Sequence, residues 1–350
     1  MKQTLASLKD LKTLPFDDII DVRAPAEFAE DHVPGAISLP VLSDAERAEV
    51  GTVYVQQDPF LARKLGAALV ARNAATHLQG PLADRPGSWR PLVYCWRGGQ
   101  RSGSFASILA QIGWRVGLID GGYKSYRRLV VRAMYDDPLP LRVILLDGGT
   151  GTAKTRILGH LAEMGQQVLD LEGLAQHRGS LLGGMAGGQP SQKAFESRIA
   201  MALVDMDPAR PVFIEAESYK IGARILPPSL WRAMLGAAHV HVSAPLQARA
   251  DYLVEAYADL MQDAAVLDDK LGVLAQFHGH EAIAKWRELS AKGAFADLAA
   301  DLVQHHYDPS YRRSSRRAGA PLLGLNLPSL KTPDLKDAAA QIAALSDKPA

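Results

Sequence analysis

The stretch RVILLDGGTGTAKT, residues 142–155, decides the fold of the second half of the chain. It begins with an apolar run typical of a buried strand and continues into a glycine-rich turn. Gly148, Lys154 and Thr155 stand at the spacing of a P-loop, and a helical segment follows. In such a loop the backbone N–H groups hold a phosphate, the lysine neutralises its charge and the threonine hydroxyl is available to Mg²⁺. The alternative is an ordinary glycine-rich turn between a strand and a helix.

Ala153 departs from the P-loop pattern, because it occupies the position of the second glycine. Alanine is small, and we expect the loop to tolerate it if its φ angle is negative. With Gly148 and Gly151 retained, the loop is still expected to present its N–H groups to a phosphate.

The segments around this stretch predict an α/β fold. Short apolar runs typical of strands alternate with segments whose apolar residues recur every three to four positions, as in helices. Such alternation predicts parallel sheets with crossover helices. The expected strands are residues 17–23, 91–95, 115–120, 142–148, 166–173, 211–217 and 237–244, and the expected helices are 60–73, 102–113, one from Thr155 and 332–345.

Two prolines close together in DDPLPLR, residues 136–142, mark the expected domain boundary. The chain has 350 residues, enough for two domains of ordinary size. We therefore predict one domain over residues 1–137 and a second over 138–350, the latter with a helical C-terminal part.

The single cysteine of the chain, Cys95, follows a second apolar strand in PLVYCWRGGQRSGS, residues 91–104. Glycines in the loop allow backbone N–H groups to turn toward the sulfur, and the following helix adds positive potential from its N-terminus. Together with two arginines, these features favour the thiolate and would hold an anionic group carried on the sulfur. A buried structural cysteine, the alternative, does not need such neighbours. The supporting residues are Arg97, Gly98, Gly99 and Arg101.

The composition is that of a globular protein, with 47% hydrophobic and 22% charged residues. A single cysteine excludes an internal disulfide, which fits a reducing cytoplasm. Neither a run of membrane-spanning length nor a signal-peptide pattern occurs, so we expect a cytoplasmic protein without a membrane partner. The formal net charge of +1 does not by itself indicate a nucleic-acid binder.

Positive charge is nevertheless concentrated in two clusters, one within residues 121–135 and one within 311–317. Each is a candidate phosphate-binding patch, and each is equally explained by a solvated face. If RNA is a partner, they are the best candidates for contacts to its backbone, and Tyr123 and Tyr126 either stack on an unpaired base or belong to the core. The candidate cations are Lys124, Arg127, Arg128, Arg132, Arg312 and Arg313.

Carboxylates and histidines provide less specific candidates. Glu215 and Glu217 end the expected strand 211–217, where either one serves a metal ion, acts as a base or is only structural. The histidines of HGH at 278–280 and HH at 305–306 are candidate zinc ligands, but neither a cysteine nor a paired acidic motif completes such a site. No metal site is therefore assigned.

Three stretches of the first half resemble the rhodanese domain. DVRAPAEFAEDHVPGA (21–36) is similar to its N-terminal signature, CWRGGQRS (95–102) to its active-site loop and LIDGGYKSY (118–126) to its closing Gly-Gly segment. Rhodaneses carry sulfur or selenium as a persulfide-type adduct on the loop cysteine, so the resemblance implies that Cys95 is the chalcogen-carrying nucleophile. Asp31 stands where that family usually has glycine, which we expect to change a turn and not the chemistry. Asp21 and Arg23 are expected to pair at the strand end.

The rhodanese-like half, the P-loop and the single cysteine, in this order, resemble the tRNA 2-selenouridine synthase family over nearly the whole chain. The stretches that carry this resemblance are residues 39–54, 94–104, 120–127, 148–155, 169–184, 189–197, 214–222 and 305–311. Residues 39–54 are an insertion that simple rhodaneses lack. The resemblance implies a transferase that exchanges the sulfur of 2-thiouridine, at the wobble position of certain tRNAs, for selenium from selenophosphate. It also implies geranylation of that sulfur by geranyl diphosphate.

The resemblance also implies a division of labour between the two halves. Cys95 handles the selenium, and the P-loop holds a phosphate-bearing substrate, preferably the diphosphate of the geranyl donor with Mg²⁺. Ala153 disfavours ordinary ATP hydrolysis and suits a loop that does not split a nucleotide.

No tightly bound cofactor is implied, the partners are the tRNA and a supply of selenophosphate, and the oligomeric state is not indicated. Helices within residues 246–275 either line an apolar pocket for the geranyl chain or only form part of the hydrophobic core. The phosphate-binding residues are Gly148, Gly151, Lys154 and Thr155.

Two other functions fit parts of the sequence. A rhodanese sulfurtransferase fused to a small-molecule kinase or NTPase predicts sulfur transfer and ATP turnover without RNA. A tRNA-binding or regulatory module with an inactive rhodanese loop predicts RNA binding without turnover, but the intact Cys95 and its arginines argue against it.

Overall fold

The computed structural model describes residues 1–314 and 319–347, and its contacts divide the chain into two units. The first unit comprises residues 1–139 together with 190–205 and 224–230. The second comprises residues 140–189, 206–223 and 231–350. Each unit contains a parallel sheet with helices, which confirms the predicted α/β class. The two segments of the second half that join the first unit were not indicated by any sequence pattern.

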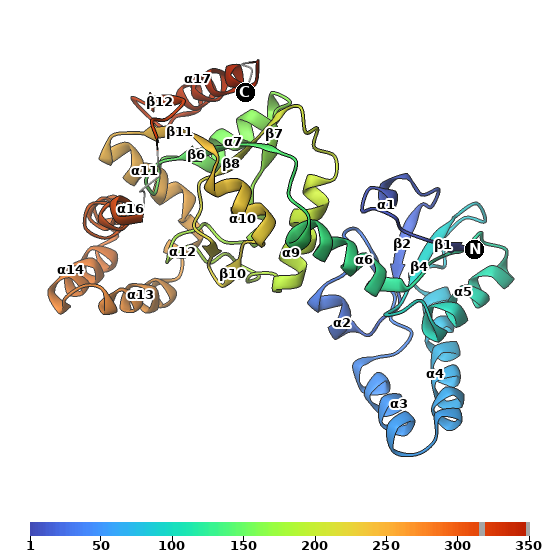
Figure 1. The fold of residues 1–350 in the computed structure, drawn as a ribbon. Helices are drawn as coiled ribbons and strands as arrows, with labels where there is room; N and C mark the ends of the chain where they lie inside the picture. Colours follow the sequence, from blue (N-terminus) through green and yellow to red (C-terminus); the bar gives the residue numbers. More distant parts are fainter. Residues whose placement is uncertain (315–318, 348–350) are drawn as a thin grey trace. The chain divides into compact units, whose positions relative to one another are not determined.

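All residues of the first unit are described, and its five-stranded parallel sheet has the order β1-β5-β4-β2-β3 (Figure 1). The strands are β1 (Lys2–Gln3), β2 (Asp18–Asp21), β3 (Ile37–Ser38), β4 (Pro91–Tyr94) and β5 (Gly117–Ile119). Its helices are α1 (Asp10–Thr13), α2 (Pro25–Glu30), α3 (Asp44–Gln56), α4 (Pro59–Gln79), α5 (Gln100–Ile112), α6 (Gly122–Val131) with a π-helical turn at Arg132–Asp136, and α9 (Gln192–Leu203), and β10 (Arg224–Ile225) also belongs to it.

The sheet of the first unit places two loops at one edge. Ile20 of β2 and Val93 of β4 pack with Phe105 and Leu109 of α5 in one buried cluster. The chain leaves β2 toward β3 and leaves β4 toward β5, in opposite directions across the sheet. The crevice at the carboxyl ends of β2 and β4 is therefore a topological switch point, where open α/β sheets usually bind ligands. Cys95 follows β4 at this crevice.

Helices α3 and α4 form a hairpin in the insertion region (Figure 1). Ser43 and Glu46 make a capping box at the start of α3, since each side chain accepts a hydrogen bond from the other residue's backbone N–H, at 3.2 and 2.8 Å. The Asp58 side chain caps α4 by accepting a hydrogen bond from the N–H of Leu61 at 2.7 Å. These local signals define the two helix starts.

The second unit, in its described part, has a five-stranded parallel sheet in the order β12-β11-β6-β8-β7. The strands are β6 (Arg142–Asp147), β7 (Gln167–Leu169), β8 (Pro211–Glu215), β11 (Ala238–Ser243) and β12 (Leu323–Asn326), and β9 (Lys220–Ile221) is short and separate. The helices, with α10 at a boundary between the units, are α7 (Lys154–Glu163), α8 (Leu171–Ala175), α10 (Pro228–Leu235), α11 (Leu246–Ala256), α12 (Ala258–Met261), α13 (Ala264–Val273), α14 (His280–Ala291), α15 (Phe295–Leu302), α16 (Asp308–Ser314) and α17 (Thr332–Ala343).

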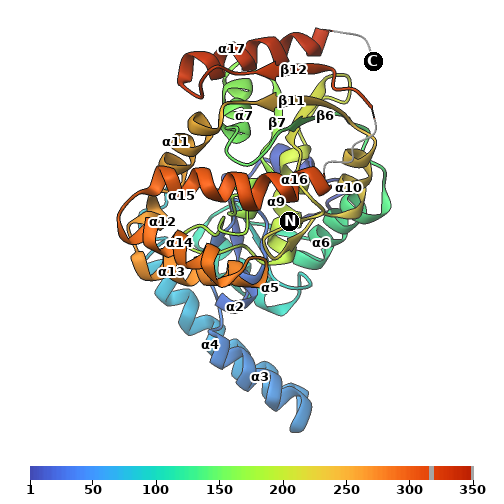
Figure 2. The ribbon, with the colours of Figure 1, turned by 90° about the vertical axis from the view of Figure 1, so that its left-hand side faces the viewer.

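One pair of helices covers a face of this sheet, and a second group of helices packs mainly on itself. Helices α7 and α17 pack against one face through a cluster that includes Leu146, Ile157, Val240 and Ala338. Helices α11 to α16 gather into a separate helical layer (Figure 2), which confirms the predicted helical C-terminal part. None of the helices in the described part of the chain is long and apolar enough to cross a membrane.

One strand is shorter than the sequence predicts. Residues 166–173 were expected to be extended, but β7 ends at Leu169 and α8 begins at Leu171. Asp170 makes the change, because its carboxylate accepts a hydrogen bond from the N–H of Gly173 at 2.8 Å and caps the short helix.

Candidate functional site

Cys95 lies at the carboxyl end of β4 and is only 3% exposed. Its sulfur accepts a hydrogen bond of 3.1 Å from the hydroxyl of Ser102, a buried residue in the first turn of α5. The rest of the cysteine side chain packs in the buried cluster of the first unit. The thiol is therefore held in one position at the N-terminal end of a helix.

Glycines allow the cysteine loop and the Gly-Gly segment to lie against one another. Gly98 has a φ of +66°, and a Cβ atom there would lie 2.9 Å from a backbone carbonyl oxygen before that segment. Gly122 has a φ of +59°, and its Cβ would lie 2.3 Å from the carbonyl oxygen of Cys95. That same carbonyl accepts a hydrogen bond from the N–H of Tyr123 at 2.8 Å. Both motifs therefore require glycine for the same close approach.

The two loop arginines have different surroundings. Arg101 is half-buried and donates to the Glu27 carboxylate at 2.7 Å, and Arg47 binds the same carboxylate at 3.1 Å. Burial alone would raise the pKa of Glu27, but the hydrogen bond and charge of Arg101 hold this pKa below its usual value. The charge of Arg101 is thus compensated rather than fully directed at the sulfur. Arg97 is exposed beside the loop.

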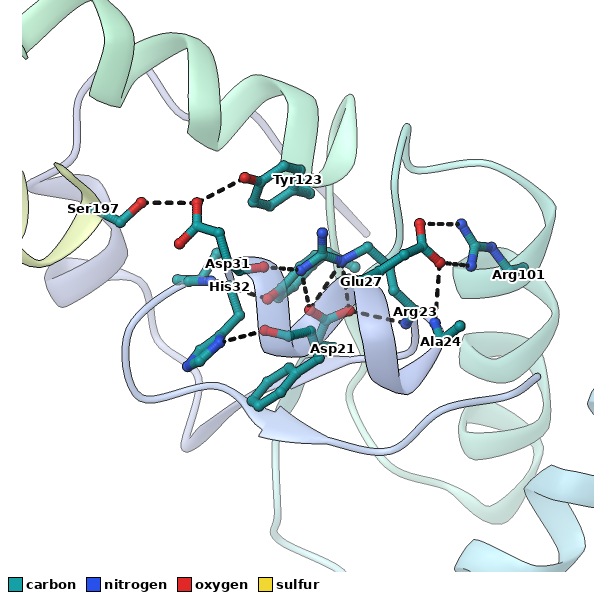
Figure 3. A network of polar contacts seen from close by, with 12 residues as sticks. Asp21, Arg23, Ala24, Glu27, Asp31, His32, Arg101, Tyr123 and Ser197 are labelled. Atoms are coloured by element: carbon teal, nitrogen blue, oxygen red, sulfur yellow. Dashed lines mark hydrogen bonds and ion pairs between the residues drawn. The ribbon is translucent and has the colours of Figure 1, made fainter. Parts of the chain in front are cut away.

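Asp21 and Arg23 form the expected pair at the end of β2, and both are buried (Figure 3). The guanidinium donates to the carboxylate at 2.6 Å and to the carbonyl of Asp31 at 2.6 Å. It also lies over the ring of Tyr123, 4.1 Å from the centroid. The pair therefore ties β2 to the end of α2 and to α6.

Asp31 is buried, and its carboxylate connects the end of α2 to side chains of α6 and α9 (Figure 3). Its carboxylate accepts hydrogen bonds from the hydroxyls of Tyr123 at 2.7 Å and Ser197 at 2.9 Å, and lies 3.9 Å from Arg127. Burial raises the pKa of Asp31, against the opposing effect of these partners. Its φ is −169°, extended backbone that any residue adopts, so aspartate occupies this position without backbone strain.

Part of the first basic cluster is structural. Arg127 is half-buried, forms an ion pair with Glu196 and donates to the carbonyl of Lys193 at 3.1 Å, which fastens α6 to α9. Tyr123 and Tyr126 are buried, so they belong to the core and are not available to stack on a base.

The remaining cationic candidates lie on the surface. Lys124 and Arg128 are exposed on α6, and Arg132 is exposed but bound to Asp137 at 2.9 Å. Arg312 is exposed on α16. The side chain of Arg313 and the arginines at 316 and 317 lie outside the described residues.

The P-loop stretch forms the predicted strand, turn and helix, with β6 ending at Asp147 and α7 beginning at Lys154. Gly148 has a φ of +155°, and a Cβ atom there would lie 2.4 Å from a carbonyl oxygen of β11. The Lys154 ammonium donates to the carbonyl of Gly148 at 2.8 Å. Ala153 has a φ of +58°, so the condition under which the loop was expected to tolerate alanine is not met. This left-handed conformation costs an L-residue about 1 kcal/mol.

Acidic side chains lie next to the first turn of α7. The hydroxyl of Thr155 donates to the Glu172 carboxylate at 2.9 Å, and the Glu215 carboxylate accepts from the N–H of Glu172 at 2.7 Å. Glu215 is fully buried, and within the described residues its second oxygen has no hydrogen-bond partner. Burial, with the charge of Asp170, raises the pKa of Glu215 well above its usual value.

Glu172 was missed by the sequence reasoning, although a signal existed. Glu172 lies near the end of the expected strand 166–173, and the carboxyl ends of parallel strands meet at one edge of a sheet. Burial raises the pKa of Glu172, while the charge of Lys154 opposes the rise.

A cavity of about 430 Å³ lies over the P-loop. Its lining includes Lys154, Thr155 and Glu172, together with Leu253 of α11 and Tyr257, the residue between α11 and α12. The cavity therefore combines groups suited to a phosphate with an apolar wall.

Hard oxygen donors beside the loop fit Mg²⁺ bound together with a phosphate. Thr155 and Glu172 are already 2.9 Å apart, and such sites need only one or two protein ligands. No group of three or more potential metal ligands occurs in residues 1–314 and 319–347. His278 and His306 lie 3.0 Å apart, nitrogen to nitrogen, next to Trp286 in the helical part.

Comparison with known proteins gives two family matches. Residues 3–129 match the rhodanese-like domain, and residues 141–285 match the tRNA 2-selenouridine synthase AAA domain. The chain is also similar to curated proteins named tRNA 2-selenouridine synthase. That of Nitrosomonas europaea is 37% identical over 263 residues, which cover 73% of this chain and 68% of the relative. That of Shewanella loihica is 36% identical over 278 residues, which cover 79% and 72%. That of Aeromonas salmonicida is 38% identical over 253 residues, which cover 71% and 67%.

Proposed function

The chain belongs to the tRNA 2-selenouridine synthase family, enzymes that act on tRNA, and we propose that it works in two steps through an S-geranyl intermediate. In the proposal, the sulfur of wobble 2-thiouridine is first alkylated by geranyl diphosphate and then replaced by selenium from selenophosphate. The observation that carries the proposal is the presence in one chain of a held thiol, Cys95, and a phosphate-type loop whose cavity has an apolar wall.

We assign the alkylation to the second unit. The thiocarbonyl sulfur attacks the first carbon of the geranyl chain, a carbon–sulfur bond forms, and diphosphate leaves with the electrons of the broken carbon–oxygen bond. The leaving group gains negative charge, which the loop N–H groups and Lys154 would stabilise. Lys154 now binds the neutral carbonyl of Gly148, and a diphosphate oxygen would be a stronger, charge-assisted acceptor.

Mg²⁺ would neutralise further charge on the diphosphate when bound. Thr155 and Glu172 are the residues that would hold it. Glu215 holds Glu172 in place, because its carboxylate accepts a hydrogen bond from the backbone N–H of Glu172. We therefore treat Glu215 as a positioning residue. Glu217 lines the cavity over the loop.

We assign the selenium step to Cys95. A thiocarbonyl sulfur is a poor leaving group, and alkylation turns it into a thioether that leaves as geranylthiolate. The selenium of selenophosphate forms a bond to carbon 2 of the base while the carbon–sulfur bond breaks. Water then cleaves the phosphorus–selenium bond and phosphate is released, so no net redox change occurs. The Ser102 hydroxyl orients the Cys95 sulfur, and exposed Arg97 of the same loop is the candidate cation for the anionic selenium donor.

The tRNA backbone is the proposed partner of the exposed cations of α6. Lys124 and Arg128 are exposed on the helix whose first turn binds the Cys95 loop through Tyr123. Arg127 is excluded from this role by its ion pair with Glu196.

The Lys154→Ala variant tests the division of labour. With 2-thiouridine tRNA and geranyl diphosphate, we expect this variant to lose most geranylation, by two orders of magnitude or about 2.7 kcal/mol in the barrier. With tRNA that already carries S-geranyl-2-thiouridine, it should convert the base to selenouridine at the wild-type rate. Intact geranylation together with lost selenation would contradict the assignment of the P-loop.

A further inference from the structure

A second, apolar cavity lies directly beside the P-loop cavity in the second unit. It is lined by residues of α11, α12, α13 and α15, with Leu260 and Ala299 among them. Three residues, Thr150, Leu253 and Tyr257, line both cavities. The two cavities therefore share one wall, which begins at the phosphate loop and ends among apolar side chains.

The P-loop is fixed against this wall. A Cβ atom on Gly151 would lie 3.0 Å from the side chain of Leu253, so the loop backbone contacts α11 directly. Arg249 of α11 donates to the carbonyl of Thr150 at 2.8 Å and is itself held by Asp308 at 2.6 Å. The distance between a phosphate on the loop and the apolar cavity is thus set by the fold.

The hydroxyl of Tyr257, a polar group of the shared wall, already has a hydrogen-bond partner. The hydroxyl of Tyr257 bonds to the hydroxyl of Ser180 at 2.7 Å, and the guanidinium of Arg178 lies over the Tyr257 ring, 4.8 Å from its centroid. A polar ligand would find few free partners in the second cavity, whereas an apolar group gains free energy by leaving water there.

We propose that the two cavities form one binding site for an allylic diphosphate, with the diphosphate on the P-loop and the end of the hydrocarbon chain between α11, α12 and α15. This inference rests on the proposed function, in which the loop holds geranyl diphosphate. The apolar cavity measures about 50 Å³. A cavity that holds benzene measures about 150 Å³. Only the terminal methyl groups of the chain fit a cavity of this size, and the rest of the chain lies along Leu253 and Tyr257.

The first unit offers a competing apolar site. A cavity of about 310 Å³ lies between α3 and α4, lined by Val50, Ala67 and Arg63 among others. The Arg63 guanidinium lies 5.9 Å from the centroid of the Phe60 ring, and Arg101 is paired with Glu27, so the cations there are already engaged. This cavity supplies the matched control.

Calorimetric binding of three probes, inorganic diphosphate, dimethylallyl diphosphate and geranyl diphosphate, tests the proposal on the full chain with Mg²⁺. In the wild type, affinity should rise along this series, with geranyl diphosphate at least about tenfold tighter than inorganic diphosphate. Ala299→Phe fills the second cavity and should remove this gain, while its affinity for inorganic diphosphate stays within about twofold. Ala67→Phe, the control in the α3–α4 cavity, should keep the wild-type affinities.

Each other outcome overturns a defined part of the account. If Ala299→Phe binds geranyl diphosphate as tightly as the wild type, or if only Ala67→Phe loses the gain, the chain binds elsewhere and the inference is wrong. Should Ala299→Phe fail to fold, the wild-type series decides, because equal affinity for all three probes contradicts an apolar subsite. If inorganic diphosphate does not bind the wild type and Lys154→Ala leaves geranyl diphosphate binding unchanged, the proposed role of the P-loop fails instead.

Discussion

The carboxylate of Asp31 accepts a hydrogen bond of 2.9 Å from the hydroxyl of Ser197, a residue 166 positions later in the chain. With the ion pair of Arg127 and Glu196, this contact fastens α9 onto the first unit. Asp31 is therefore the buried acceptor that holds α9, a helix from the second half of the sequence, within the first unit.

The first prediction concerns this anchor. Asp31→Ala leaves the hydroxyls of Tyr123 and Ser197 without their buried acceptor, which should destabilise the fold by about 2–3 kcal/mol. Asp31→Asn keeps one acceptor oxygen and removes a buried charge, so its cost should be below about 1 kcal/mol. Urea unfolding measures both. Equal destabilisation by the two variants would show that the charge, rather than the acceptor, holds α9.

The second prediction concerns Ala153. Its φ of +58° is unfavourable for alanine, and glycine adopts this conformation without a Cβ penalty. Ala153→Gly should therefore stabilise the protein by up to about 1 kcal/mol and preserve diphosphate binding. Ala153→Val, with a β-branched side chain, should destabilise it. Thermal unfolding checks both variants, and a lower Tm for the glycine variant would contradict the assigned strain.

The third prediction is a pH dependence from Glu215. Burial raises its pKa well above the usual value, so the folded state keeps a proton that the unfolded state releases above about pH 4.3. Stability must then fall as pH rises between the unfolded and folded pKa values, by about 1.4 kcal/mol per pH unit for one proton. Glu215→Gln removes this titration and should be more stable than the wild type in that window.

Denaturant unfolding of both proteins from pH 4 to 8 checks this sign. Asp31, whose pKa is also raised, remains in the variant and contributes the same slope to both curves, whereas the charge of Glu172 interacts with Glu215 and is part of the effect measured. Parallel curves would mean that Glu215 is ionised in the folded protein.

The fourth prediction concerns RNA. Removing both Lys124 and Arg128 should weaken binding of 2-thiouridine tRNA and reduce the slope of log affinity against log salt by about 2, because two phosphate contacts are lost. Lys336→Ala, an exposed change on α17, is the control and should leave the slope unchanged. An unaltered slope in the double variant would place the RNA on another surface.

The elements around both loops could be predicted because their signals are local. An apolar run, a glycine-rich turn and a helix in succession identified β4 with Cys95 and β6 with Lys154. Contacts between distant residues left no such pattern. Arg101 was expected to serve the cysteine, but Glu27, 74 positions earlier, compensates its charge.

Conformation at single residues was equally hard to predict. From the sequence, Asp31 was interpreted only as a turn substitution. Its burial could not be predicted, because it depends on residues of α6 and α9 that only the fold brings close to it. For Ala153 the sequence supplied only a condition, tolerance at a negative φ, and the observed φ of +58° depends on the shape of the whole loop, in which Lys154 binds the carbonyl of Gly148.

The most direct test of the central claim is mass spectrometry of nucleosides from 2-thiouridine tRNA incubated with geranyl diphosphate and selenophosphate. Wild-type protein should yield 2-selenouridine, and Cys95→Ala should stop at S-geranyl-2-thiouridine. If the wild type forms neither product but transfers sulfur from thiosulfate or hydrolyses ATP without RNA, the two-step account is wrong. The chain would then act as a sulfurtransferase joined to an NTPase.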